Sequence, residues 1–418
     1  MIECIESLRK YNAWDREIGK TGFIRSHYLS GIEHSLGTGL IKVLVGQRRT
    51  GKSYILRQII NMLIGKGINP INICYINMEM IEFADVDDFV KLKEIIEVYR
   101  KYLNPKGRIY LFIDEIQLVS GWEKLVNSYS QNTGDEIEVF LTGSNSTLLS
   151  GELATLLSGR YITFSVFPFS FQEFTEYYNI PRNRESMIRY LKSGGLPELL
   201  HIESEDMRLH YTQSLRDTII LRDIVQRYHI KDAWLLDNLF GYLVSQTGRL
   251  FSVNNIVNYF NTHKIKASHD TISSYLHYLK QTYLIHEIPR YNIKGKEILS
   301  GARKFYLNDL AYRNYAMLQS ETGFSQNIEN LVFMHLLSHS YSTFVGTLNE
   351  KEIDFVAERG NEKLYIQVTY LLTDEIVIAR EFGNLELIND HYPKQVISMD
   401  DQYIGHTNGI KHIPVWEL

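Results

Sequence analysis

Short apolar runs alternate with amphipathic segments through the first 165 positions of the chain. The runs lie within 40–45, 73–79, 109–113 and 138–143 and are largely apolar, which is typical of strands buried on both faces of a parallel sheet. The segments between them have the periodicity of helices. The pattern predicts an α/β fold with a doubly wound parallel sheet over residues 1–165.

A different pattern follows in the middle of the chain. From 184 to 247 apolar residues recur three and four positions apart, so we expect a small helical lid over residues 166–247. Residues 248–304 are typical of two short helices, a strand, a basic turn and a second strand, which is the order of a winged helix-turn-helix. Residues 305–418 are expected to form a further α/β domain.

The composition is ordinary for a soluble globular protein, with 44% hydrophobic and 22% charged residues over 418 positions. A chain of this length is expected to form several domains. Cys4 and Cys74 are too few for a disulfide framework or a cysteine zinc site. The N-terminal segment lacks the apolar core of a signal peptide, and no apolar run approaches the length of a membrane span. We therefore expect a cytoplasmic protein without a membrane segment.

Charge is distributed unevenly along the chain. The net charge is −5, but residues 248–304 carry nine Lys or Arg and three Asp or Glu, a local charge of +6 that leaves −11 for the rest. A basic helix-turn-helix favours contact with nucleic-acid phosphates, although winged helices also serve as protein-binding modules. The residues expected at such a contact are Lys264, Lys266, His269, Ser273 and Ser274 near the second helix and Lys294 and Lys296 on the wing.

The first apolar run ends in the motif G-x-x-x-x-G-K-S, which is followed by a helical pattern. This is the context of a phosphate-binding loop, in which two glycines let the backbone N–H groups face the phosphates. Lys52 would reach the β and γ phosphates of ATP, and the Ser53 hydroxyl would bind Mg²⁺. The expected nucleotide contacts are Gly46, Gln47, Arg48, Arg49, Thr50, Gly51, Lys52, Ser53 and Tyr54.

Two further apolar runs end in polar residues that suit nucleotide hydrolysis. The run 109–113 leads into Asp114 and Glu115, and the carboxyl ends of parallel strands are where open α/β sheets bind ligands. We expect Asp114 to hold Mg²⁺ through water and Glu115 to act as the general base. Ser144 and Asn145 follow the next run and would orient the attacking water, unless they form only a turn.

Several arginines are alternatives for contact with the nucleotide. Arg160 follows the core and would stabilise charge on the ATP of a neighbouring subunit in a homo-oligomer, or would be an ordinary surface residue. The sequence does not rank Arg216, Arg222 and Arg227 of the lid. The turn GGLPE at 194–198 is either a helix stop or a backbone contact to the nucleotide.

Together these motifs resemble a known family, the prokaryotic AAA-superfamily ATPases of the archaeal-ATPase type. In that family the core and a winged helix are followed by a PD-(D/E)XK nuclease-like domain. The resemblance covers nearly the whole chain. The motifs that carry it are GQRRTGKSY, LFIDEIQ, LTGSNS, the GR before PFSFQEF, GGLPE, KFYLNDLAYRN, IENLVFMHLL, EIDFV and YIQVTY.

The resemblance also implies the positions of a nuclease site. It places Glu329 and Asp354 as metal-binding acids, Gln367 where a second strand carboxylate belongs and Thr369 where a lysine belongs. Threonine cannot replace a cation, although a lysine such as Lys363 or Lys351 could reach in from elsewhere in the sequence. We therefore expect a nuclease fold that has lost its chemistry.

The resulting hypothesis is a Mg²⁺-dependent ATPase that acts as a switch. Its nucleotide state would position the winged helix and the nuclease-like domain, with nucleic acid as the leading partner. Two alternatives stay open: a signalling or scaffold NTPase that binds proteins, and an ATP-gated DNA nuclease.

Overall fold

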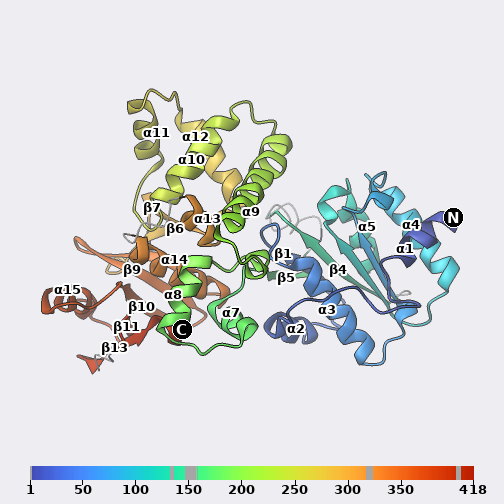
Figure 1. Cartoon of the computed structure of the whole chain (residues 1–418), viewed down its shortest axis with the longest axis horizontal. Helices are drawn as coiled ribbons and strands as arrows, with labels where there is room; N and C mark the ends of the chain where they lie inside the picture. Colours follow the sequence, from blue (N-terminus) through green and yellow to red (C-terminus); the bar gives the residue numbers. More distant parts are fainter. Residues whose placement is uncertain (1, 132–135, 146–156, 158, 317–322, 402–405) are drawn as a thin grey trace. The chain divides into compact units, whose positions relative to one another are not determined.

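The computed structural model describes residues 2–131, 136–145, 157, 159–316, 323–401 and 406–418. The chain divides into two compact units, Met1–Val166 and Phe167–Leu418. Each unit is described by itself below, and the elements of both are labelled in Figure 1.

The first unit is built on a five-stranded parallel sheet with the order β2-β3-β4-β1-β5. Its strands are β1 (Ile41–Val45), β2 (Ile73–Asn77), β3 (Ile109–Asp114), β4 (Ile137–Gly143) and β5 (Tyr161–Ser165). Every residue of β1, β2 and β3 is buried, as their apolar sequences require. The parallel α/β sheet expected from the sequence is confirmed.

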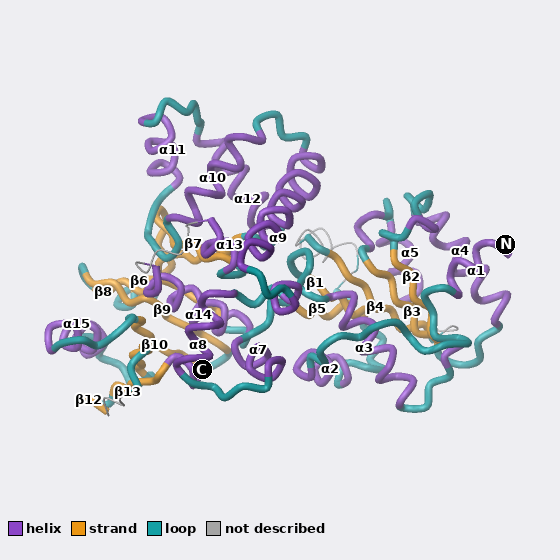
Figure 2. Tube along the Cα trace, viewed as in Figure 1, coloured by secondary structure: helices purple, strands orange, loops and turns teal. Residues whose placement is uncertain are grey.

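Two helices precede the first strand of this sheet, and three more alternate with strands β1 to β4 (Figure 2). They are α1 (Ile2–Arg9), α2 (Ser26–Glu33), α3 (Lys52–Gly65), α4 (Phe89–Leu103) and α5 (Trp122–Gln131). Helix α3 starts directly after the loop that follows β1, and its buried face includes Ile55, Leu56 and Ile59. Phe112 of β3 and Phe140 of β4 stack at a ring-centroid distance of 4.4 Å within the sheet. The packing therefore holds the carboxyl ends of β1, β3 and β4 at one edge.

The second unit begins with helices, and further helices follow its first two strands. The helices are α7 (Phe171–Tyr178), α8 (Arg184–Ser193), α9 (Glu205–Thr218), a π-helical segment (Ile219–Gln226), α10 (Ala233–Ser245), α11 (Val253–Thr262), α12 (His269–Gln281), α13 (Ala311–Ala316), α14 (Phe324–Ser338) and α15 (Glu375–Glu386). One apolar core joins α10 and α12 through residues that include Leu236, Leu239, Leu276 and Leu279. The helical character expected for 184–247 is present.

An eight-stranded mixed sheet forms the other part of the second unit, with the order β12-β13-β11-β10-β9-β8-β6-β7. Its strands are β6 (Ile285–Asn292), β7 (Glu297–Leu307), β8 (Ser342–Leu348), β9 (Lys351–Arg359), β10 (Glu362–Val368), β11 (Lys394–Ser398), β12 (His406–Thr407) and β13 (Ile410–Pro414). The β6–β7 hairpin joins this sheet because β6 pairs in parallel with β8, with Arg290 opposite Val345. The boundary expected at 304/305 thus falls inside β7.

Candidate functional site

The loop between β1 and α3 has the backbone shape that an anion site needs. Gly51 is the N-cap of α3 with φ of +96°, a left-handed conformation that favours glycine. A Cβ at Gly46 would lie 2.2 Å from the carbonyl oxygen of Val166, so only glycine fits there. Lys52 is 4% exposed, and its Nζ donates to the carbonyl oxygens of Gly46 (3.0 Å) and Gln47 (2.9 Å). The ammonium therefore stands over the loop at the N-terminus of a helix, where phosphate is favoured.

Residues outside the motif hold this loop in place. The Arg25 guanidinium is buried and donates to the carbonyl oxygen of Thr50 (3.2 Å), while the Thr50 hydroxyl donates to that of Gln47 (2.9 Å). Gln58 of α3 accepts from the backbone N–H of Arg25 (3.2 Å). Sequence reasoning missed Arg25 and Gln58, because they lie apart from the motif and carry no spacing signal of their own.

Asp114 and Glu115 lie where β3 ends. Asp114 is fully buried, and its carboxylate accepts from the hydroxyls of Tyr75 (2.7 Å) and Thr142. The Thr142 hydroxyl also accepts from the backbone N–H of Glu115 (2.9 Å). Neighbouring strands β2 and β4 therefore fix both acids, and sequence reasoning missed Tyr75 and Thr142, which it treated only as members of strands.

Glu115 is buried at 7% exposure, and its neighbours shift the pKa of its carboxyl. Burial raises the pKa of its carboxyl, Lys52 lowers it, and Asp114 raises it again. Gln117 donates to this carboxylate and, at 3.3 Å, to the Ser144 hydroxyl. A base whose pKa lies above that of a free glutamate is closer to the pH at which it must take a proton.

The structure brings most of the expected residues of the ATPase core together. Ser144 and Asn145 are buried directly after β4, beside the end of β3 that carries the two acids. Arg160 instead precedes β5 and is exposed, and its carbonyl oxygen accepts from the N–H of Ile41 (3.0 Å). Because Ile41 begins β1 and the phosphate loop follows the end of β1, Arg160 lies at the far end of that strand, about 13 Å away along it. Arg160 therefore lies at the end of β1 opposite the phosphate-loop motif.

The three lid arginines belong to the second unit. Arg216 of α9 forms ion pairs with Asp217 (2.8 Å) and Asp237 (3.6 Å). Arg222 and Arg227 are exposed, at and just beyond the π-helical segment. Their role at the nucleotide stays a prediction.

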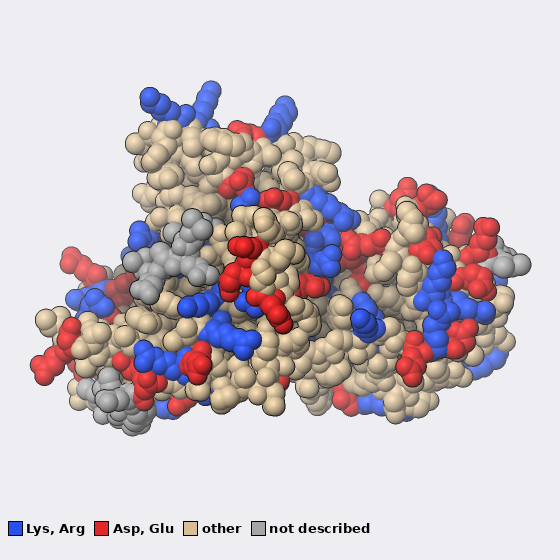
Figure 3. Space-filling view, in the orientation of Figure 1, with Lys and Arg blue, Asp and Glu red and all other residues tan. Residues whose placement is uncertain are grey.

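Two lysine pairs of the basic segment are exposed in different parts of the second unit. Lys264 and Lys266 lie between α11 and α12, at an end of the unit from which basic side chains project (Figure 3). Lys294 and Lys296 lie in the β6–β7 turn, next to the pair formed by Asn292 and Thr347 of β8. The turn lies at the C-terminal end of β6, and the N-terminal end of this strand, which follows α12, is about 23 Å away.

Three other basic residues of the segment are paired or buried and contribute less surface charge than their number suggests. Lys280 and Arg303 both form ion pairs with Glu287. The Lys304 side chain is only 3% exposed. The local charge of +6 therefore overstates the charge that this region presents to a partner.

The nuclease-like positions meet around a residue that the sequence did not single out. The Nζ of Lys304, on β7, lies 2.7 Å from Glu329 of α14, 2.8 Å from Glu352 and 3.5 Å from Asp354, both of β9. Lys363, one of the two lysines that the sequence offers as a substitute for the missing one, instead pairs with Glu358 (2.9 Å). Sequence reasoning missed Lys304 and Glu352. The only signal for Glu352 was its spacing of two from Asp354, which places both residues on one face of a strand. Lys304 carried no such signal.

Gln367 and Thr369 lie beside this cluster but serve the scaffold. The Gln367 carbonyl accepts from the N–H of Asp354 (2.8 Å), and its amide donates to the buried carboxylate of Glu381 (2.9 Å). Thr369 is buried, and its N–H donates to the carbonyl oxygen of Ile397 (3.0 Å). Across the described parts of the chain, no three His, Cys, Asp or Glu side chains are arranged to hold a metal ion. The residues present therefore do not fit the metal that the nuclease resemblance implies.

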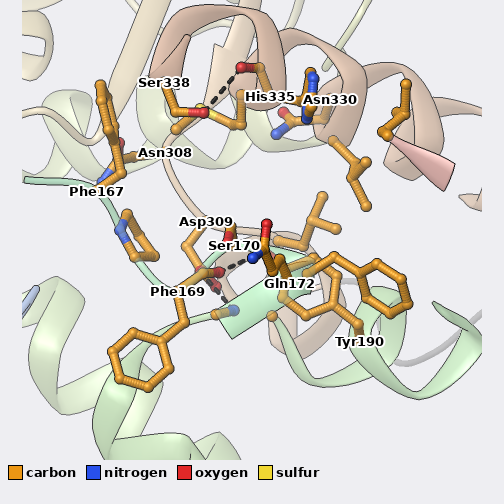
Figure 4. Close-up of a pocket in the computed structure, with 18 of the residues that line it drawn as sticks. Phe167, Phe169, Ser170, Gln172, Tyr190, Asn308, Asp309, Asn330, His335 and Ser338 are labelled. Atoms are coloured by element: carbon orange, nitrogen blue, oxygen red, sulfur yellow. Dashed lines mark hydrogen bonds between the residues drawn. The ribbon is translucent and has the colours of Figure 1, made fainter. Parts of the chain in front are cut away.

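Gly194 and Gly195 of the GGLPE turn line a cavity of about 190 Å³ in the second unit (Figure 4). Asp309 borders it and accepts from the N–H groups of Gly195 and Ala311, both at 2.8 Å. Gly194 has φ of +74°, and a Cβ there would lie 2.2 Å from the Asp309 carboxylate. Burial raises the pKa of Asp309 to about 7. The turn is thus part of the scaffold of this unit.

Comparison with known proteins agrees with the first unit being a nucleotide-binding core. Residues 38–175 match a family described as an AAA domain, and residues 184–323 match a domain of unknown function, DUF8612. The chain is 35% identical to an uncharacterized protein of Haemophilus influenzae over 91% of this chain and 94% of that one. It is 31% identical to an uncharacterized protein of Methanocaldococcus jannaschii over 89% of this chain and 85% of that one.

Among solved structures, the chain is similar to a Walker-type ATPase of Pyrococcus abyssi. The identity is 17% and the TM-score 0.47, with coverage of 70% of this chain and 95% of that chain. Of the helices described in the present structure, all are too short or too polar to cross a bilayer.

Proposed function

The chain belongs to one family with its Haemophilus influenzae and Methanocaldococcus jannaschii relatives and carries an AAA domain, and we propose that it is a Mg²⁺-dependent ATPase that acts as a switch on nucleic acid. The observation that carries the proposal is the meeting of the Gly46–Ser53 loop with Asp114 and Glu115 at one edge of the sheet. These are the parts that bind and cleave a nucleoside triphosphate in P-loop enzymes.

Each part has a role in hydrolysis. The loop N–H groups and the N-terminus of α3 bind the phosphates, and Lys52 exchanges its loop carbonyl partners for phosphate oxygens. Ser53 and Asp114 are the residues that would hold Mg²⁺, which neutralises charge developing on the phosphates. Glu115 accepts a proton from the attacking water, and Gln117 keeps its carboxylate oriented.

The second unit supplies the proposed contact with nucleic acid. Lys264 and Lys266 are exposed between two helices, as expected for phosphate contacts that position a helix-turn-helix. The nuclease-like part contributes binding surface and no cleavage, because its lysine is bound by three carboxylates. A scaffold that grips a protein partner is the alternative, and salt-dependent binding of DNA separates the two.

The ATPase proposal is tested by separating binding from turnover. Lys52→Ala should lose ATP binding, whereas Glu115→Gln should bind ATP and lose about 100-fold or more of its turnover. Both are measured on the full chain by nucleotide titration and phosphate release. Glu94→Gln, an exposed change on α4, is the control and should behave as wild type. Full turnover in Glu115→Gln would remove this residue from the mechanism.

A further inference from the structure

Three elements of the second unit converge on one ammonium group. Lys304 comes from β7, Glu329 from α14, and Glu352 and Asp354 from one face of β9. The lysine side chain is 3% exposed, and the carboxylates are 14%, 42% and 16% exposed in the same order. The ammonium is therefore buried among three acidic side chains that come from two other elements of the unit.

We infer that Lys304 is a built-in cation that fills the place of a divalent metal, so that this cluster braces the sheet and binds no metal in the wild-type protein. The inference concerns the second unit only and stands whether or not the first unit hydrolyses ATP.

Some of the oxygen atoms that a metal would need already accept hydrogen bonds. Oε1 of Glu329 accepts from Lys304 and from the Tyr306 hydroxyl (2.6 Å). Oδ2 of Asp354 accepts from the N–H of Val368 (2.8 Å), and the Gln367 carbonyl accepts from the N–H of Asp354. A hard cation such as Mg²⁺ needs six oxygen ligands in near-octahedral geometry. It could enter only after the ammonium had left.

The lysine remains charged in this environment. Burial lowers the pKa of Lys304, but Glu329, Asp354 and Glu352 outweigh burial and raise it above the ordinary value for lysine. Removal of the ammonium would leave three carboxylates facing one another with no cation between them. Buried charge without a partner is strongly destabilising, and a divalent ion would relieve it.

Replacement of the lysine should therefore cause a loss of stability that a divalent metal ion restores. A loss of packing alone would not be restored by metal. Lys304→Met keeps the length of the stem and removes the charge. Without metal, its Tm should fall by about 5 °C or more. Addition of MnCl₂ to the nucleotide-free full chain should restore most of this loss and reveal one Mn²⁺ site by electron paramagnetic resonance. The affinity of that site should exceed that of any second-unit site in the wild type by at least tenfold.

Two controls separate a cation site from general effects. Lys363→Met removes a lysine of the same sheet that pairs with one glutamate, Glu358, so its Tm should not respond to Mn²⁺. Lys304→Met with Glu352→Gln removes one of the three carboxylates and should weaken Mn²⁺ binding about tenfold or more relative to Lys304→Met.

Two results would overturn the inference. One is Lys304→Met protein whose Tm is unchanged by Mn²⁺. The other is a Mn²⁺ site in wild-type protein that disappears in Glu352→Gln, which would make Lys304 a neighbour of a metal and not its replacement. This second measurement does not depend on the folding of any Lys304 variant, because Glu352 is the most exposed acid of the cluster.

Discussion

At the scale of single residues, the Glu115 carboxylate shows how several neighbours set one chemical property. Burial and Asp114 raise its pKa, whereas Lys52 and Gln117 lower it. The carboxylate is active as a base only when it is ionised. Any change that raises its pKa further must therefore reduce the ionised fraction at a given acidic pH.

Gln117 offers a direct test of this balance. Gln117→Leu removes a hydrogen bond that lowers the pKa of Glu115, so the acid limb of the kcat–pH profile should move to higher pH. Gln131→Leu changes an exposed glutamine whose amide donates to Asn127, and it should leave the limb in place. A Gln117→Leu limb at the wild-type pH, with the fold intact, would contradict the assignment of Glu115 as the base.

Gly194 is a second residue whose identity follows from geometry. Gly194→Ala places a Cβ against the Asp309 carboxylate and forces a left-handed conformation, so we expect a loss of about 2 kcal/mol or more in the free energy of unfolding. Gly383→Ala is the matched control, because this helical position in α15 has no atom within 4 Å of the added Cβ. It should be neutral or stabilise by up to about 1 kcal/mol. Urea denaturation measures both, and equal effects would contradict the account of the GGLPE turn.

At the scale of elements, local patterns and long-range pairings differ in what the sequence can predict. The phosphate loop and the acids after β3 could be predicted, because their spacing and the apolar runs before them lie within a few residues. The pairing of β6 with β8 could not, since Arg290 and Val345 are 55 positions apart and hydrophobic alternation does not identify a strand's partner. Lys304 was for the same reason counted as one basic residue among nine.

The separation of the two lysine pairs leads to an expectation for DNA binding by the basic segment 248–304. If all four lysines contact phosphates, the slope of log affinity against log salt should be about −3 to −4. If only the pair between α11 and α12 does so, the slope should be about −2. Lys264→Ala with Lys266→Ala should then bring it close to zero, and Lys294→Ala with Lys296→Ala should leave it unchanged. DNA titrations at several salt concentrations measure this.

The control for loss of charge alone is Lys101→Ala with Lys106→Ala, which removes two exposed lysines of the first unit. Absence of DNA and RNA binding at low salt, with and without ATP, would replace the nucleic-acid proposal by the protein-scaffold alternative.

At the scale of the whole molecule, chemistry and recognition are assigned to different compact units. The residues proposed for ATP hydrolysis lie within Met1–Val166, and the proposed nucleic-acid lysines lie within Phe167–Leu418. A switch requires that ATP and its hydrolysis products favour different arrangements of these units. If several chains assemble, a neighbouring chain could take part in ATP hydrolysis.

Arg160 offers a test of whether hydrolysis depends on assembly. Its backbone lies about 13 Å along β1 from the phosphate loop. Arg160→Ala should therefore bind ATP normally, and it should hydrolyse ATP slowly only if a neighbouring chain normally receives this arginine. The wild-type rate per chain should then fall on dilution, while Arg9→Ala should match the wild type. A rate per chain that stays constant down to nanomolar protein would show that no arginine acts between subunits.

The course of β7 has a consequence for anyone who divides this protein into fragments. A truncation at 304/305 would cut the strand in the middle and separate Lys304 from the three acids that surround it. It would also strip β6 and β7 from β8 and leave the backbone of β8 open along one side, which invites pairing with other chains and aggregation. Expression of the second unit should therefore start near Phe167 and keep the chain whole through Leu418.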